Sequence, residues 1–470
     1  MQAVTHPSEL KTIVQHAGSV LAGQLAVIAF GVADTVIAGR YSDTALAALS
    51  VGSALYISVY VGLIGIVQAL LPIWSEMLGA GQRRTVGASV RQSLYLCAII
   101  TAVGMAALAF PAPLLVWAEV PSALLTEVGS YLTVLAFAFA PALLFRIYGA
   151  FNQSLGKPLM VTSLQVLALA VKIPLSIWLV AGGAGVQPMG AVGCAWATLI
   201  VNYFLLALAV GMLKTRIVYA PFDLWQRMER PDWRQIGHFF RLGLPGGMAY
   251  LVEVTSFTLM ALFIARLGTV ASASHQIAAS IAGALYMMPL SLAIAASARV
   301  SFWLGAGDAQ RAKALVFMSL KLSALVSIGF CATIFVAKGV LAGWYSSTPA
   351  VVIQASSLLV WVAAYHVADS LQAVSAFLLR CYRVTLAPLA IYGVLLWGLG
   401  LWGGYQLTYA NWPLPATGAA RSFWMASTVA IALVAMSLVA LLVRAASNIR
   451  PAALGPLGSP GKSKVASTTD

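Results

Sequence analysis

Charged side chains are scarce in this sequence. Asp, Glu, Lys and Arg together make up 9% of its 470 residues, whereas hydrophobic residues make up 61% and the mean hydropathy is +0.91. A soluble domain carries about 25% charged residues to cover its surface. The composition therefore excludes a water-soluble protein and predicts a polytopic membrane protein.

Acidic residues are the rarer of the charged types. The chain has 13 Asp and Glu against 27 Lys and Arg, for a formal net charge of +14. A nucleic-acid-binding protein gathers its basic residues on one face or stripe, but here they punctuate the apolar runs. No nucleic-acid partner is expected.

The sequence also lacks the motifs of metal, disulfide and nucleophile chemistry. Its five histidines form no HExxH motif, which excludes the common zinc-dependent hydrolases. Its cysteines stand singly at apolar positions without CxxC spacing and are interpreted as packing residues: Cys97, Cys194, Cys331 and Cys381. We therefore expect that the protein is not an enzyme. We also expect no cofactor, apart from Na⁺ as a possible coupling ion.

Apolar runs long enough to cross about 30 Å of hydrocarbon recur along the chain. They predict an all-α protein with twelve transmembrane helices, at 13–38, 45–72, 91–116, 126–148, 159–181, 189–213, 239–265, 272–300, 314–337, 350–378, 386–408 and 422–443. Few Lys and Arg residues fall in the loops of one side: Arg40, Arg266, Lys338 and Arg421. The positive-inside rule then predicts that both termini are cytoplasmic.

The chain divides into two similar halves. The sequence "LGAGQ" at 78–82 recurs as "LGAGD" at 304–308, and the same offset of 226 carries Arg40 onto Arg266. Because each half has an even number of spans, the copies run parallel, as in carriers that work by alternating access. We expect two pseudo-symmetric six-helix lobes at 1–220 and 239–445, a cytoplasmic inter-lobe loop at 221–238 and a disordered cytoplasmic tail at 446–470.

Four ionisable residues lie well inside the predicted spans: Asp34, Lys172, Glu253 and Asp369. A charge at this depth is costly, and such residues face a bundle interior or a wet cavity. Two of the three acids belong to the C-terminal half and are expected to share one cavity. A buried pair of carboxyl groups can take up a proton near neutral pH or bind a hard cation such as Na⁺ through its oxygens.

Several stretches resemble the multidrug and toxic compound extrusion (MATE) antiporters, over essentially all of residues 10–445. They are "GVADTVIAGRYSDTALAALSVG", "LPIWSEMLGAGQ", "ASASHQIAASIAGALYMMPLSLAIAASARVSFWLGAGD" and "YHVADSLQAVSAFLLRCYR". The resemblance implies a V-shaped pair of lobes that exports organic cations in exchange for Na⁺ or H⁺. It also implies a monomer in the bacterial inner membrane.

The resemblance also implies where the functional residues lie. The cation-coupling site of the bacterial subgroup falls on Glu253, Tyr286 and Asp369, with Tyr365 one turn before Asp369 on the same helix face. If Na⁺ is the coupling ion, Glu253 and Asp369 are its ligands. The family's N-lobe carboxylate, with roles in cation coupling and substrate binding, falls on Asp34. His275 also matches a family motif, and we expect its side chain to form a structural hydrogen bond.

The fifth span departs from the family pattern. Where the family tends to carry an Asn-Ile-Pro-Leu-Asn-like stretch, this chain reads "KIPLS", with Lys172 and Ser176 at the polar places. A protonated lysine cannot ligate Na⁺, so an ion pair between Lys172 and Asp34 is expected in place of a second cation site.

The substrate and two alternatives complete the prediction. Bulky lipophilic cations are held by aromatic faces and thioethers, so Met287 and Met288, beside Tyr286, are predicted to line the substrate cavity. A flippase for lipid-linked saccharides is the alternative with the same fold, but it would line its cavity with Arg and Lys. A channel would more often be an oligomer of few-helix subunits.

Overall fold

The computed structural model describes residues 8–117, 121–183, 185–410 and 417–448, and in these ranges it contains helices and no strand. Twelve helical segments are long and apolar enough to span a membrane. They are α1 (Glu9–Tyr41), α2 with α3 (Asp43–Gln68, Leu70–Gly79), α4 (Arg83–Ala109), α6 (Leu125–Ser154), α7 (Pro158–Ala181), α8 (Ala191–Thr215), α9 (Trp233–Ala265), α10 (Thr269–Gly305), α11 (Ala309–Tyr345), α12 (Pro349–Cys381), α13 with η3 and α14 (Leu386–Tyr392, Gly393–Trp402, Gly403–Tyr409), and α15 (Ala420–Ser447). The predicted all-α fold with twelve spans is confirmed.

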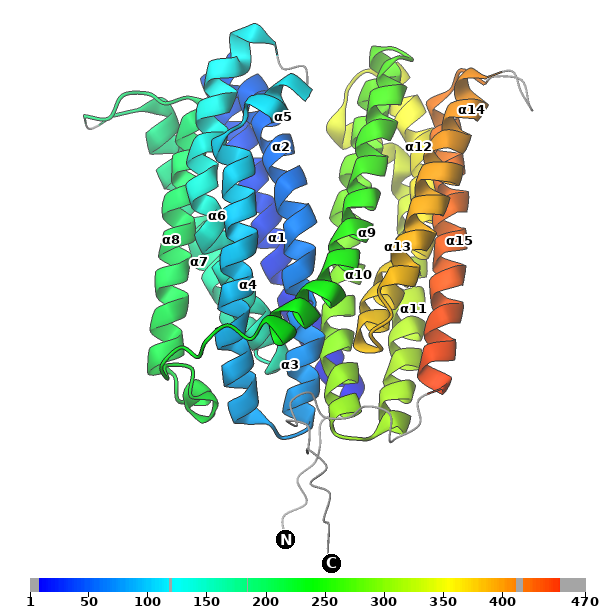
Figure 1. The fold of residues 1–470 in the computed structure, drawn as a ribbon. Coiled ribbons are helices and arrows are strands. Elements are labelled where there is room, and N and C mark those ends of the chain that lie inside the picture. The colour runs from blue at the N-terminus through cyan, green and yellow to red at the C-terminus, as the bar shows by residue number, and fades with distance from the viewer. Residues whose placement is uncertain (1–7, 118–120, 184, 411–416, 449–470) are drawn as a thin grey trace, which may run out of the picture.

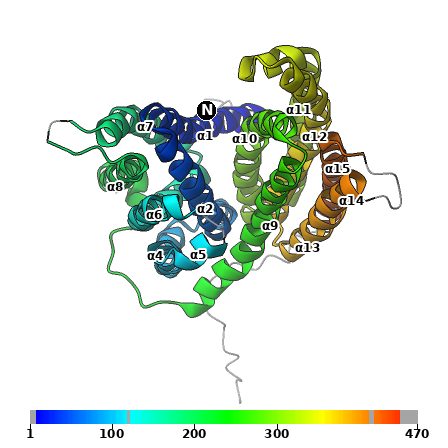
Figure 2. The same ribbon diagram turned by 90° about the horizontal axis from the view of Figure 1, so that it is seen from above.

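The spans form two groups. Helices α1–α8 make one lobe and α9–α15 the other, and Figure 2 shows the two groups side by side. We call them the N-lobe and the C-lobe. They touch through α1 with α10, α2 with α9 and α3 with α10. The end of the molecule at which α1 begins and α15 ends, here called the terminal end, is where α3 meets α10, whereas α2 and α9 stand apart at the opposite end (Figure 1).

The two LGAG motifs pack against each other at the terminal end. A Cβ atom at Gly79 would overlap the carbonyl oxygen of Phe302, and one at Gly305 would overlap the carbonyl oxygen of Glu76. The offset of 226 that relates the two halves also relates these two contacts. The repeat therefore builds a reciprocal, pseudo-symmetric crossing in which only glycine lets the backbones approach so closely.

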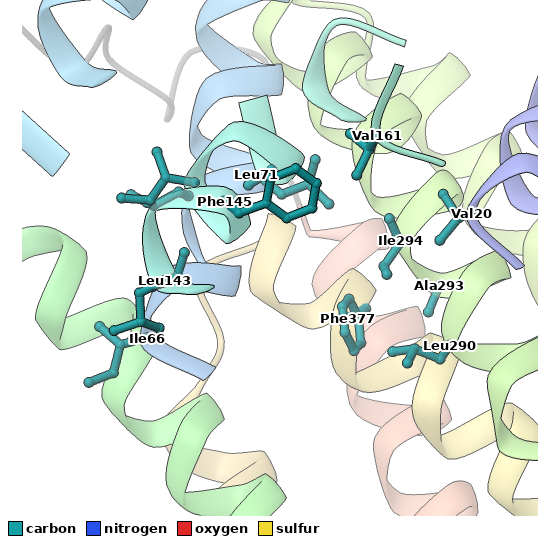
Figure 3. Close-up of a cluster of buried hydrophobic side chains, with 14 of the residues drawn as sticks. Val20, Ile66, Leu71, Leu143, Phe145, Val161, Leu290, Ala293, Ile294 and Phe377 are labelled. Carbon is teal, nitrogen blue, oxygen red and sulfur yellow. The ribbon is translucent and has the colours of Figure 1, made fainter. Parts of the chain in front are cut away.

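Apolar side chains from both lobes share one buried cluster near this crossing (Figure 3). The N-lobe contributes Val20, Ile66, Leu71, Leu143, Phe145 and Val161, and the C-lobe contributes Leu290, Ala293, Ile294 and Phe377. Burial of such side chains stabilises by about 1.5–3 kcal/mol each relative to exposure to water. The lobes can part at the terminal end only by wetting this cluster.

Several boundaries differ from the predicted ones, and two of the differences have identifiable reasons. The third span was expected at 91–116, but α4, which begins at Arg83, ends at Ala109, because Pro111 cannot continue the helix. The seventh was expected from 239, but α9 begins at Trp233, because the Asp232 carboxylate accepts hydrogen bonds from the Arg234 and Gln235 amides and caps the helix. Most of the tail predicted to be disordered, 449–470, lies outside the described residues.

Candidate cation site

Glu253 on α9 and Asp369 on α12 lie together inside the C-lobe, where both are buried. Gln372, one turn after Asp369, links them: its Nε2 atom donates to Oδ1 of Asp369 at 2.9 Å and to Oε1 of Glu253 at 3.4 Å. The two carboxylate oxygens are therefore at most 6.3 Å apart, the sum of these distances. At this separation the two carboxylate charges interact strongly. Binding of a proton or cation to one carboxylate therefore changes the affinity of the other for a proton or cation.

The amide of Gln372 has a fixed orientation. The hydroxyl of Tyr392, at the end of α13, donates to Oε1 of Gln372, which leaves the NH₂ group for the carboxylates. Both side chains are buried. Neither was identified from the sequence, although Gln372 lies three residues after Asp369 and hence on the same helix face.

A small cavity adjoins Glu253. Its volume is about 40 Å³, and its walls include Tyr250, Tyr286 and Arg380. A water molecule needs about 10–15 Å³ of such space, so the cavity has room for about three water molecules beside the carboxylate. Tyr286 thus lies next to Glu253, as the family resemblance implies.

The other C-lobe residues expected at the site occupy its surroundings. Tyr365 is buried one turn before Asp369, and its ring packs edge-on against Phe257 and Trp424. Met287 and Met288 are half-buried and do not line the cavity beside Glu253. The expected structural role of His275 is consistent with its geometry, because Trp424 donates to its Nδ1 atom at 3.2 Å.

Arg380 is a third residue of the candidate site that the sequence reading missed. The tenth span was expected to end at 378, but α12 continues to Cys381 and keeps Arg380 at the cavity wall. Its Nη1 atom donates to Oε1 of Gln68 on α2 at 3.1 Å, so it joins the two lobes. A fixed positive charge therefore shares the cavity with Glu253.

Asp34 and Lys172 form an ion pair inside the N-lobe. The Nζ atom of Lys172 lies 2.9 Å from Oδ2 of Asp34, and the lysine side chain is 1% exposed. Ser176 donates to the other carboxylate oxygen at 3.1 Å, and Lys172 also donates to Thr198 at 2.7 Å. The lysine thus occupies the place beside Asp34 that a metal ion would need.

A larger cavity of about 610 Å³ lies in the N-lobe and includes Asp34 in its wall. Tyr56, Tyr60 and Tyr131 line it, together with Arg146, whose Nε atom donates to the Tyr60 hydroxyl at 2.9 Å. The fourth span was expected to end at 148, but α6 continues to Ser154, so Arg146 lies within the helix. This cavity is large enough for an organic molecule, and the three tyrosine rings form part of its wall.

The chemistry of the two lobes therefore differs. The C-lobe holds two buried carboxylates with one shared amide donor, whereas the N-lobe carboxylate is already neutralised by a lysine. In the described part of the chain no group of three or more His, Cys, Asp and Glu side chains is placed to hold a metal ion. The C-lobe pair is the candidate for reversible uptake of a cation.

The sequence and structure were compared with those of known proteins. The MatE family matches residues 20–178 and 245–405, one segment in each lobe. The chain is 35% identical to the "Probable multidrug resistance protein NorM" of Aromatoleum aromaticum, over 89% of this chain and 90% of that protein. It is 31% identical to the "Multidrug resistance protein PmpM" of Pseudomonas aeruginosa, over 93% and 92% of the two chains.

Solved structures show the same fold. The eukaryotic MATE transporter AtDTX14 superposes with a TM-score of 0.83 at 20% identity, covering 93% of this chain and 97% of that one. The bent form of the Vibrio cholerae MATE transporter VcmN superposes with a TM-score of 0.80 at 16% identity, covering 94% and 97%.

Proposed function

Since this chain belongs to the MatE family, whose members are transporters and not enzymes, we propose that it is an antiporter that exports organic cations and drugs by alternating access. The observation that carries the proposal is the pair of buried carboxylates, Glu253 and Asp369, on separate helices of one lobe. The flippase alternative has no support, because the relatives are named as multidrug resistance proteins and the C-lobe site is acidic.

The protein works as a multi-pass monomer in the bacterial inner membrane, with both termini in the cytoplasm. The distribution of Lys and Arg supports this orientation. It makes the terminal end the cytoplasmic end, so the lobes are closed toward the cytoplasm in the present structure. This arrangement corresponds to the outward-facing stage of the cycle.

Uptake of the coupling ion drives the return step. An ion that binds the carboxylate pair from outside neutralises charge in the C-lobe and biases the equilibrium between the two lobe arrangements. The small cavity beside Glu253 supplies water for this exchange. Arg380, which shares that cavity and contacts Gln68 of the N-lobe, transmits the change of charge to the lobe junction.

We assign the proton as the coupling ion. Na⁺ requires oxygen ligands, but the group between Glu253 and Asp369 is the NH₂ of Gln372, whose oxygen is taken by Tyr392. An amide donor stabilises the two carboxyl groups while either of them is negatively charged. It needs no rearrangement when one carboxylate takes up a proton. Na⁺ binding would require the Gln372 amide to turn over.

Substrate binds between the lobes and in the N-lobe cavity. Tyr56, Tyr60 and Tyr131 offer ring faces to a lipophilic cation. Asp34 attracts the cation once its pair with Lys172 opens. Met287 and Met288 on α10 contribute adaptable contacts when the lobes rearrange.

The test is efflux of a fluorescent organic cation from proteoliposomes under separately imposed pH and Na⁺ gradients. We expect efflux with the pH gradient alone. Glu253→Gln and Asp369→Asn should each abolish coupled efflux while expression persists, because an amide keeps the shape and removes the charge. Lys321→Gln, on α11, is the matched control and should leave efflux unchanged.

The outcomes separate the parts of the proposal. Efflux that follows only the Na⁺ gradient would refute the proton assignment and leave the antiport function intact. Robust gradient-driven efflux by the double variant Glu253→Gln with Asp369→Asn would refute the role of the carboxylate pair.

A further inference from the structure

A basic cavity lies between the lobes at the terminal end. Its volume is about 380 Å³, and it shares no lining residue with the cavity beside Glu253. His16, Arg83 and Lys157 come from the N-lobe, and Arg299 comes from α10 of the C-lobe. We propose that this cavity binds a phosphate group, carried either by an anionic lipid or by a soluble phosphate.

The charges of the cavity are incompletely balanced. Arg299 pairs with Glu9, with 2.6 Å between Nη2 and Oε1. Arg83 and Lys157 have no ion pair in the part of the chain that the structure describes, and both are exposed. Two positively charged side chains without an ion pair at one concave site attract an anion. Basic pockets between transmembrane helices are known to bind phosphate-bearing headgroups.

Two helices begin at this cavity with their positive ends. Helix α4 starts at Arg83, and α7 starts directly after Lys157. Neither helix has a side chain that caps its first amides by a hydrogen bond. Uncapped amides and the helix dipole both favour an anion at such a place.

His16 supplies independent evidence for a ligand. Its side chain is 5% exposed, it lines the cavity, and its Nε2 atom has no hydrogen-bond partner among the described residues. Buried polar atoms are nearly always hydrogen-bonded. A phosphate oxygen in the cavity would supply the missing partner, which neither the cation site nor the helix packing accounts for.

The site exists only while the lobes are closed at this end. Arg299 and Phe302 belong to the C-lobe, whereas the remaining basic residues belong to the N-lobe and Phe222 to the segment between the lobes. A ligand that needs both walls binds this arrangement and not the one that opens to the cytoplasm. By population shift it stabilises the closed arrangement.

Binding is tested on the purified full-length protein in a neutral detergent, without drug or ion gradient. Short-chain phosphatidylglycerol, short-chain phosphatidylcholine and inorganic phosphate are titrated separately, and the apparent Kd is read from the shift in Tm. The test variants are Arg83→Gln, Lys157→Gln and their double variant. The charge-matched control is Arg227→Gln with Arg234→Gln, two exposed residues of the same end that do not line the cavity.

We expect the parent protein to bind phosphatidylglycerol or inorganic phosphate and to bind phosphatidylcholine more weakly than phosphatidylglycerol. Each removed charge should weaken binding by roughly fivefold, and the double variant by more than about tenfold. Binding of phosphatidylglycerol alone identifies a lipid headgroup as the source, and binding of inorganic phosphate identifies a soluble one. His16→Phe, which keeps the ring volume, should also weaken binding.

Two results would overturn the proposal. One is the absence of any Tm shift with either phosphatidylglycerol or inorganic phosphate in the folded parent. The other is an equal loss of affinity in the control pair, which would indicate diffuse surface attraction. Because no transport is measured, neither result depends on whether the protein exports cations.

Discussion

At the scale of single residues, the C-lobe site depends on which end of one amide faces the carboxylates. The Tyr392 hydroxyl accounts for the orientation of Gln372. Without that donor, the amide oxygen could turn toward Glu253 and Asp369 and join them as a cation ligand. On the proposal of proton coupling, selectivity for the coupling ion would depend on Tyr392, which acts through Gln372.

Tyr392→Phe should therefore introduce Na⁺ sensitivity. Removal of the hydroxyl frees Gln372 to present its oxygen, so an imposed Na⁺ gradient should stimulate efflux that it leaves unchanged in the parent. The measurement is initial efflux rate in proteoliposomes at fixed pH with and without Na⁺. Tyr405→Phe, on α14, is the control, and an unchanged response to Na⁺ in Tyr392→Phe would contradict the explanation.

The N-lobe pair permits a double-mutant test. Removal of one member of a buried ion pair leaves an unpaired charge and costs about 3–5 kcal/mol. Lys172→Ala should therefore lower the Tm and the efflux rate about as much as Asp34→Ala, and the double variant should recover part of both losses. Purely additive damage would mean that the contact of 2.9 Å carries no coupling energy.

At the scale of elements, the segment between the lobes is fastened to the N-lobe. Arg91 on α4 forms an ion pair with Glu229 and donates to the carbonyl oxygen of Asp223 at 2.6 Å. Gln92 donates to the carbonyl of Arg230 and accepts from the amide of Asp232. The predicted inter-lobe loop is thus attached to α4 up to the start of α9. Relative motion of the lobes must therefore begin at α9.

This attachment has a predictable pH dependence. The hydrogen bond from Arg91 holds the pKa of Glu229 below its ordinary value of 4.5. Because its pKa is lower in the folded state, Glu229 stabilises the protein at pH values above its unfolded-state pKa. This contribution is lost as the pH falls through the folded-state pKa. Because Glu229 is well exposed, the contribution is small.

Glu229→Gln should accordingly lower the Tm slightly at neutral pH, and the difference from the parent should vanish well below pH 4.5. The measurement is a series of thermal unfolding curves across this pH range. Asp223→Asn is the control, because its pair with Arg84 is longer, at 3.4 Å, and more exposed. A difference in Tm that is independent of pH would contradict the assignment.

The sequence predicted the elements better than their ends. Apolar runs report the part of a helix inside the hydrocarbon, so all twelve spans were found. The polar start of α4 and the Asp232-capped start of α9 were missed because they lie outside the apolar runs. The deep acids were visible because charge is rare there. Gln372 and Tyr392 were not, since an uncharged polar residue in a span carries no comparable signal.

At the scale of the whole molecule, paired charges reinforce the closure of the terminal end. Glu76 on α3 lies 3.0 Å from Arg383, which follows α12, and Glu9 on α1 pairs with Arg299 on α10. Each pair has its acid in the N-lobe and its base in the C-lobe. Both ion pairs therefore join the lobes and stabilise the closed arrangement.

Breaking the half-buried pair of Glu76 and Arg383 should shift the population toward the arrangement that is open at the terminal end. We expect Glu76→Gln and Arg383→Gln each to lengthen the distance between spin labels at positions 84 and 313, on opposite lobes at this end, in a background without the four cysteines. The exchanged pair, Glu76→Arg with Arg383→Glu, should restore the short distance, because attraction between the lobes survives the exchange. If the single variants keep the short distance, the closure depends on the LGAG crossing and the apolar cluster, and this ion pair contributes nothing to it.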